Sequence, residues 1–162
     1  MKAGLIAGAL AALVAVASPA WSLDPKAAGQ PADELAAQKM LPKVRDALWT
    51  QLAKCGVDYD EKKGTYGIRL TPEVRALAGK TLTVRGFVLP MDGSDQTKHF
   101  LITRNTPVCL YCPPGGPNEV VEVHARHALA WSDKIVSVTG TFSLIDDREK
   151  ALFFRMENAE AK

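Results

Sequence analysis

The sequence has few of the features that mark common enzymes or nucleic-acid-binding proteins. Its 20 Lys and Arg residues nearly balance 18 Asp and Glu residues, for a formal net charge of +2. Nucleic acids and anionic membranes attract a basic excess, which this chain lacks. It also lacks a glycine-rich phosphate loop and the catalytic patterns G-x-S-x-G and H-E-x-x-H. These absences favour a non-enzymatic binding or accessory protein that does not bind nucleic acid.

Cysteine is scarce as well, with three residues in the chain. An odd number leaves at least one of Cys55, Cys109 and Cys112 free, metal-bound or paired with another molecule. Because there is no second C-x-x-C pair, cysteines alone cannot complete a four-cysteine zinc site. Cys55 shares an apolar helical stripe with Leu48 and Leu52, which predicts a buried core residue rather than a ligand.

The apolar run near the start of the chain is too short for a comfortable membrane span, which takes about 20 residues. This run, residues 3–17, follows one lysine and precedes an A-x-A-like tripeptide at 20–22. The pattern predicts a signal peptide over residues 1–22 that is cut after Ser22. We therefore expect a periplasmic protein without stable membrane insertion after cleavage, in which residues 23–33 form a flexible lead-in.

Residues 34–79 are expected to form a helical segment with one short strand at 65–70. Pro42 can occupy the first turn of a second helix, and Gly56 can cap the end of that helix. Thr71, followed by proline and glutamate, predicts the start of a further short helix.

Five strand patterns follow and form the expected β domain at 80–162. The first and fourth strands contain Gly86 and Gly140, and an interior glycine often marks a bend or bulge. Five short, bent strands predict a small barrel of the oligonucleotide/oligosaccharide-binding (OB) kind, with an SH3-like barrel or a small sandwich as the alternative. The expected fold class is mainly β with an N-terminal helical segment (α+β). The expected strands are 81–90, 99–104, 119–125, 134–144 and 151–156.

Three motifs occur in a specific order in this region: GKTLTVRGFVLP at 79–90, HFLI at 99–102 and CLYCPPGGPN at 109–118. Because it contains these motifs in this order, the chain resembles the DUF3299 family over about residues 48–156. The members of this family are small exported bacterial proteins of undefined biochemistry. The resemblance implies an OB-like barrel. It also implies a neighbouring envelope transporter for metals, or another periplasmic protein, as the partner. Many members have one loop cysteine followed by histidine, whereas this chain has two cysteines and no loop histidine.

The cysteine pair lies in a loop that is rich in proline. A C-x-x-C turn can direct the sulfurs of Cys109 and Cys112 at one point, and thiolates suit zinc and copper. The pair is therefore the first candidate metal site. The remaining loop residues of interest are Pro113, Pro114, Pro117 and Asn118.

Histidine is the other candidate ligand, with His99, His124 and His127 in the chain. Glu122 shares a strand face with His124 but has no evident partner, which indicates a surface role. The loop joins the second and third barrel strands, so it is expected at the opposite end of their hairpin from the histidines. This geometry argues against one site built from both groups. The alternative is a two-coordinate cysteine site, which suits Cu⁺, or a cysteine site completed from the Cys55 region or by a partner protein.

The cysteine pair has two further interpretations. In an oxidising compartment Cys109 and Cys112 can form a disulfide. A thiol–disulfide protein would use the pair in exchange reactions, although the prolines after Cys112 start no helix that would stabilise a thiolate. In an envelope interaction module the same disulfide would be structural, and closing so short a loop removes little chain entropy. All three interpretations stay open at this point.

The intact mass of the protein, expressed with its own leader and purified from the periplasm without chelators, tests these predictions. We expect the leader to be removed after Ser22. A mass lower by two hydrogen atoms indicates a disulfide and excludes a resting metal site at the cysteines. A full-thiol mass, or bound zinc or copper that is lost in Cys109→Ser, excludes the structural disulfide.

Overall fold

The computed structural model describes residues 32–108 and 114–162. The expected leader, nearly all of the lead-in, Cys109, Cys112 and Pro113 lie outside these residues. Within the described part, none of the helices has the length and apolar character needed to cross a membrane. The elements are α1 (Ala32–Met40), α2 (Ala47–Leu52), β1 (Gly56–Asp60), β2 (Thr65–Arg69), α3 (Pro72–Arg75), β3 (Thr81–Pro90), β4 (Gln96–Thr103), the 3₁₀ helix η1 (Pro117–Glu119), β5 (Val120–Ala130), β6 (Val136–Asp147) and β7 (Leu152–Ala161).

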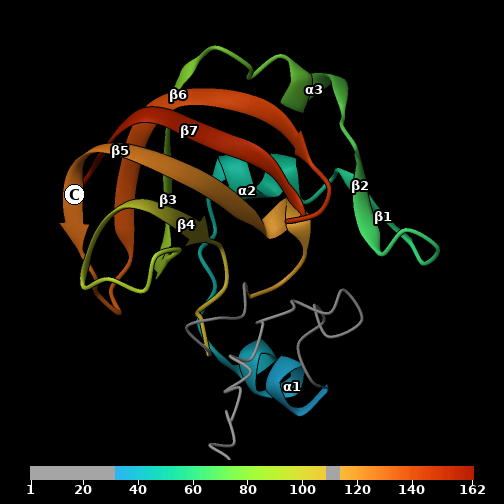
Figure 1. Ribbon diagram of the computed structural model, residues 1–162, viewed down its shortest axis with the longest axis horizontal. Helices are drawn as coiled ribbons and strands as arrows, with labels where there is room; N and C mark the ends of the chain where they lie inside the picture. The colour runs from blue at the N-terminus through green and yellow to red at the C-terminus, as the bar shows by residue number, and fades with distance from the viewer. Residues whose placement is uncertain (1–31, 109–113) are drawn as a thin grey trace, which may run out of the picture.

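Strands β3 to β7 form a closed barrel in the order β3-β4-β5-β7-β6 (Figure 1). The pairs are antiparallel except for β5 and β7, which run parallel. The prediction of a mainly β protein with a five-stranded barrel is confirmed. Strands β4, β5 and β7 therefore lie side by side in the barrel wall.

Alternation along these three strands separates the barrel interior from its outer surface. Successive side chains of a strand point to opposite faces, and alternate residues in the middle of each strand are buried in the main core. The intervening residues of β4 and β5 point outward, and Leu101 and Val120 among them form a smaller buried cluster with Leu89 of β3 and Leu152 of β7. The inward residues of the three strands are Phe100, Ile102, Val121, Val123, Phe154 and Met156.

Two glycines allow the barrel strands to bend, as the sequence predicts. Strand β3 pairs with β6 up to Gly86 and with β4 from Phe87 onward. A methyl group on Gly86 would lie 2.5 Å from the carbonyl oxygen of Thr103, so only glycine fits at this crossing. Gly140 lies at a register shift between β6 and β7.

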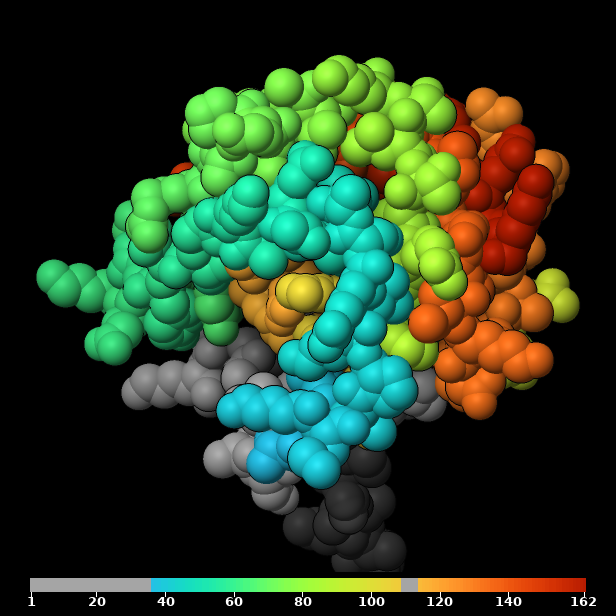
Figure 2. All heavy atoms as spheres, turned by 180° about the vertical axis from the view of Figure 1, so that it is seen from behind, coloured from blue at the N-terminus to red at the C-terminus, as the bar shows by residue number. Residues whose placement is uncertain are grey.

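The N-terminal segment differs from its prediction in where α2 begins. Pro42 does not open this helix. Asp46 caps it instead, because the Asp46 side chain accepts a hydrogen bond from the Trp49 backbone N–H at 2.9 Å. The preceding residues are extended, since Lys43 pairs with Asn105 in an isolated β-bridge. Figure 2 shows this segment, coloured cyan, lying across the face opposite to the view in Figure 1.

Helix α2 then packs its apolar side into the barrel core. Leu48, Trp49 and Leu52 are buried, and the Trp49 indole N–H donates to the Arg85 carbonyl at 2.7 Å. Cys55 is buried in the same core, as predicted. Gly56 does not cap α2, which ends at Leu52 with Ala53 as its C-cap, but begins the unpredicted hairpin of β1 and β2.

The chain beyond this hairpin follows the sequence closely. Strand β2 lies within the predicted strand at 65–70. The Thr71 hydroxyl caps α3 by accepting a hydrogen bond from the Val74 N–H at 3.3 Å. The predicted cap at Thr71 is confirmed.

Replacing Gly86 with alanine is expected to destabilise the barrel. The added methyl group would overlap the Thr103 carbonyl oxygen, and such overpacking costs about 1–3 kcal/mol. Gly67→Ala in β2 is the matched control, because nothing lies within 4 Å of its added methyl group. Urea unfolding of both variants tests this expectation, and equal free energies of unfolding would contradict it.

Candidate metal centre

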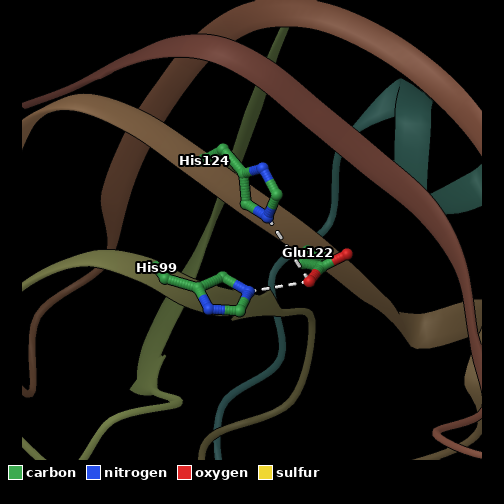
Figure 3. A group of neighbouring side chains, drawn as sticks. All are labelled: His99, Glu122 and His124. Atoms are coloured by element: carbon green, nitrogen blue, oxygen red, sulfur yellow. Dashed lines mark hydrogen bonds and ion pairs between the residues drawn. The ribbon is translucent and has the colours of Figure 1, made fainter.

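Three potential metal ligands converge on the outer wall of the barrel. His99 comes from β4, whereas Glu122 and His124 come from β5. The antiparallel register places His99 opposite His124, and Glu122 lies two residues away on the same face of β5. Figure 3 shows both imidazole rings directed toward the Glu122 carboxylate.

One atom, Oε1 of Glu122, is the common point of this group. It lies 2.7 Å from His99 Nε2, a hydrogen-bond distance, and 3.5 Å from His124 Nε2. The longer distance is outside the range of a good hydrogen bond. The potential ligand atoms of the three residues all lie within 4.8 Å of one another. The two imidazole rings meet nearly edge to face, at 80°.

The second carboxylate oxygen of Glu122 is held by β7. Arg155, which is the register partner of Glu122 on β7, donates from Nε to Oε2 at 2.6 Å. Arg155 Nη1 lies 3.6 Å from Glu157 Oε1. Glu157 Oε2 in turn lies 3.3 Å from His124 Nδ1. These contacts close a ring through Glu122, Arg155, Glu157 and His124.

The electrostatics of the ring keep Glu122 ionised. Its side chain is only 6% exposed, and the His99 and His124 side chains are 45% and 41% exposed. Burial by itself raises the pKa of Glu122. Hydrogen bonds from His99 and Arg155, together with the positive charge of Arg155, outweigh burial and hold the pKa below its ordinary value. The site therefore contains a buried carboxylate between two accessible imidazoles.

These donors fit a divalent transition metal. Ligand bonds of about 2.0–2.1 Å around tetrahedral zinc place neighbouring ligand atoms roughly 3.3 Å apart. The two separations from Glu122 Oε1, 2.7 Å and 3.5 Å, lie on either side of that value. Imidazole suits Zn²⁺ and Cu²⁺, whereas Cu⁺ prefers sulfur.

The structure brings together only part of the predicted ligand set. His99 and His124 meet, but His127 is an exposed residue of β5 outside their group. The predicted surface role of Glu122, without a partner, is wrong, because the register supplies partners on both sides. Arg155 and Glu157 were missed altogether. Their alternation with Phe154 and Met156 indicates an outward face, but nothing in the local pattern shows which strand they meet.

The predicted distance between the histidines and the loop also needs correction. His99 does not open its strand and His124 does not end its own, because β4 begins at Gln96 and β5 continues to Ala130. A bulge between Thr97 and His99 allows this extra pairing. The histidines therefore lie within the hairpin rather than at its far end. His99 is four residues from the end of β4, roughly 13 Å of extended strand.

The described part of the loop has a structural role. The Pro114 carbonyl accepts a hydrogen bond from Asn105 Nδ2 at 3.3 Å. Pro117 begins η1, and Asn118 Nδ2 donates to the Cys55 carbonyl at 3.1 Å. The Asn118 contact attaches the loop to the N-terminal segment, and the Asn105 contact attaches it to the chain just after β4.

The fold and the site define a small β-barrel protein with a histidine–carboxylate cluster on its outer wall. The sequence profile described as "Protein of unknown function (DUF3299)" matches residues 22–156. The chain belongs to the DUF3299 family, as its motifs predict.

One solved structure is similar to this chain. It is a DUF3299 family protein from Pseudomonas aeruginosa PAO1, with a TM-score of 0.52 and 18% sequence identity. The similarity covers 70% of this chain and 91% of that one. At this identity the likeness supports the fold alone. No curated protein matches the sequence.

Replacing Glu122 with glutamine is expected to reduce the free energy of unfolding by about 2–4 kcal/mol at pH 7, because Arg155 loses its closer charged partner and keeps only the longer contact with Glu157. The folded-state pKa of Glu122 is lowered. Its carboxylate therefore stabilises the protein above the unfolded-state pKa, and this contribution disappears as pH falls through the folded-state value.

The difference in free energy of unfolding between wild type and Glu122→Gln should accordingly shrink in acid. Urea unfolding at several pH values measures it. Glu160→Gln is the control, because Glu160 forms an exposed pair with Arg126. Loss of this exposed ion pair should lower the free energy of unfolding by less than about 1 kcal/mol. If the loss of unfolding free energy in Glu122→Gln stayed constant with pH, the charge of Glu122 would not be what stabilises the protein.

Proposed function

We propose that this protein is a metal-binding accessory protein that holds Zn²⁺ or Cu²⁺ through His99, Glu122 and His124. The observation that carries the proposal is the convergence of both imidazoles on one carboxylate oxygen, at 2.7 Å and 3.5 Å. Two-histidine, one-carboxylate sets bind metals in several classes of protein.

The positions of the histidines support a metal site over a simple hydrogen-bond network. Glu122 Oε1 already accepts a good hydrogen bond from His99, and Oε2 accepts one from Arg155. His124 Nε2 faces the same Oε1 at a distance that a hydrogen bond does not explain. Glu157 Oε2 lies 3.3 Å from His124 Nδ1, so the carboxylate of Glu157 is next to that nitrogen while Nε2 faces the site.

The cellular role follows from the expected export of the protein. A periplasmic metal-binding protein can carry or buffer an ion for an envelope transporter, which is the partner that the family resemblance implies. The Cys109/Cys112 pair retains its three interpretations: a thiolate metal site, a thiol–disulfide pair or a structural disulfide. The intact mass separates them.

Zinc affinity, measured by competition with a chromogenic chelator, tests the barrel site. We expect His99→Ala and His124→Ala each to weaken zinc binding by at least about 100-fold, because even residues behind a ligand affect affinity by about 10–100-fold. His127→Ala is the matched control on the same strand as His124 and should bind as wild type does. Circular dichroism confirms that the variants fold.

Two results would count against the proposal. Equal affinities of all four proteins would place the metal elsewhere. A loss in His127→Ala as large as that in His124→Ala would indicate binding through surface histidines in general.

A further inference from the structure

The number of donors at the barrel site determines what else a bound metal can hold. Within the described residues, His99, Glu122 and His124 offer one ligand atom each. Glu122 cannot easily give a second oxygen, because Arg155 Nε occupies Oε2 at 2.6 Å. Closed structural zinc sites have four protein ligands, and sites with three keep a position for water or another ligand.

The free position would face solvent. Behind Glu122 is the barrel core, since Val121 and Val123, its neighbours on β5, are fully buried. In front of it are the two histidines, whose side chains are 45% and 41% exposed. Figure 3 shows both rings on the outer side of the strands. A ligand could therefore reach the metal without displacing core side chains.

The charges around the site favour an anion at that position. Arg155 and Glu157 carry opposite charges and lie 3.6 Å apart, so they largely offset each other. Glu122 neutralises one of the two positive charges of a divalent ion. The occupied site would thus keep a net positive charge close to +1, in a partly desolvated position where Coulomb attraction exceeds that in bulk water.

We propose that the metal bound at His99, Glu122 and His124 keeps one exchangeable coordination position that takes a small monoanionic ligand from solution. This inference rests on the proposed function. In the exchange, the metal–oxygen bond to water breaks and a bond to the anion forms, with no change in oxidation state. Such a position would let an incoming donor begin to remove the ion, as an accessory protein that transfers metal requires.

The test uses the full protein loaded with Co²⁺, whose visible spectrum reports coordination, and azide as the anionic probe. We expect azide to change the spectrum in a saturable way. Arg155→Met frees Oε2 of Glu122 to bind the metal and removes a nearby positive charge, so azide affinity should fall several-fold. Arg126→Met is the matched control, because Arg126 pairs with Glu160 on the same side of the barrel wall. It should leave azide binding unchanged.

The outcomes separate the inference from the proposed function. If Co²⁺ fails to bind, or binds equally well to His99→Ala and His124→Ala, the proposed function itself fails. If Co²⁺ binds through both histidines but azide leaves the spectrum unchanged, only the exchangeable position is overturned. An intense near-ultraviolet thiolate-to-cobalt band that disappears both in Cys109→Ser and in His99→Ala would also overturn it, because the loop would then fill the position.

Discussion

The buried carboxylate of Glu122 is the constraint on which this face of the protein depends. An ionised carboxylate removed from water is costly unless charges and hydrogen-bond donors surround it. Here the donors come from neighbouring strands on both sides, with His99 on β4 and Arg155 on β7. A one-residue slip of either strand would turn these donors to the other face of the sheet. The charge therefore favours the register that assembles the site.

Closure of the barrel supplies the partners of Glu122 on its β7 side. Glu122 and Arg155 are 33 residues apart in the chain and meet only because β5 and β7 pair in parallel. The same pairing brings Glu157 to His124. An open sheet that ended at β5 would leave Glu122 with His99 and His124 alone. The topology and the chemistry of the site thus depend on the same strand contact.

The sequence predicted what depends on local pattern and missed what depends on pairing between distant segments. Alternation was sufficient to identify five strands, and the glycines indicated the bends at Gly86 and Gly140. The helix start after Asp46 was missed because residues before it pair with Asn105, far along the chain. The partners of Glu122 were missed for the same reason: a period of two shows which face a residue occupies but not which residue lies opposite.

Arg155 gives the proposed metal site a property that many structural metal sites lack. In small zinc domains the metal holds the fold together, and removal of the ion unfolds the chain. Here Arg155 and His99 already compensate the Glu122 charge, and the main core includes fully buried residues such as Trp49 and Phe142. The proposed ligands would thus be held near their binding positions before an ion arrives. A site that is preorganised but not needed for folding can gain and lose its ion without unfolding, which suits reversible metal handling better than permanent structural binding.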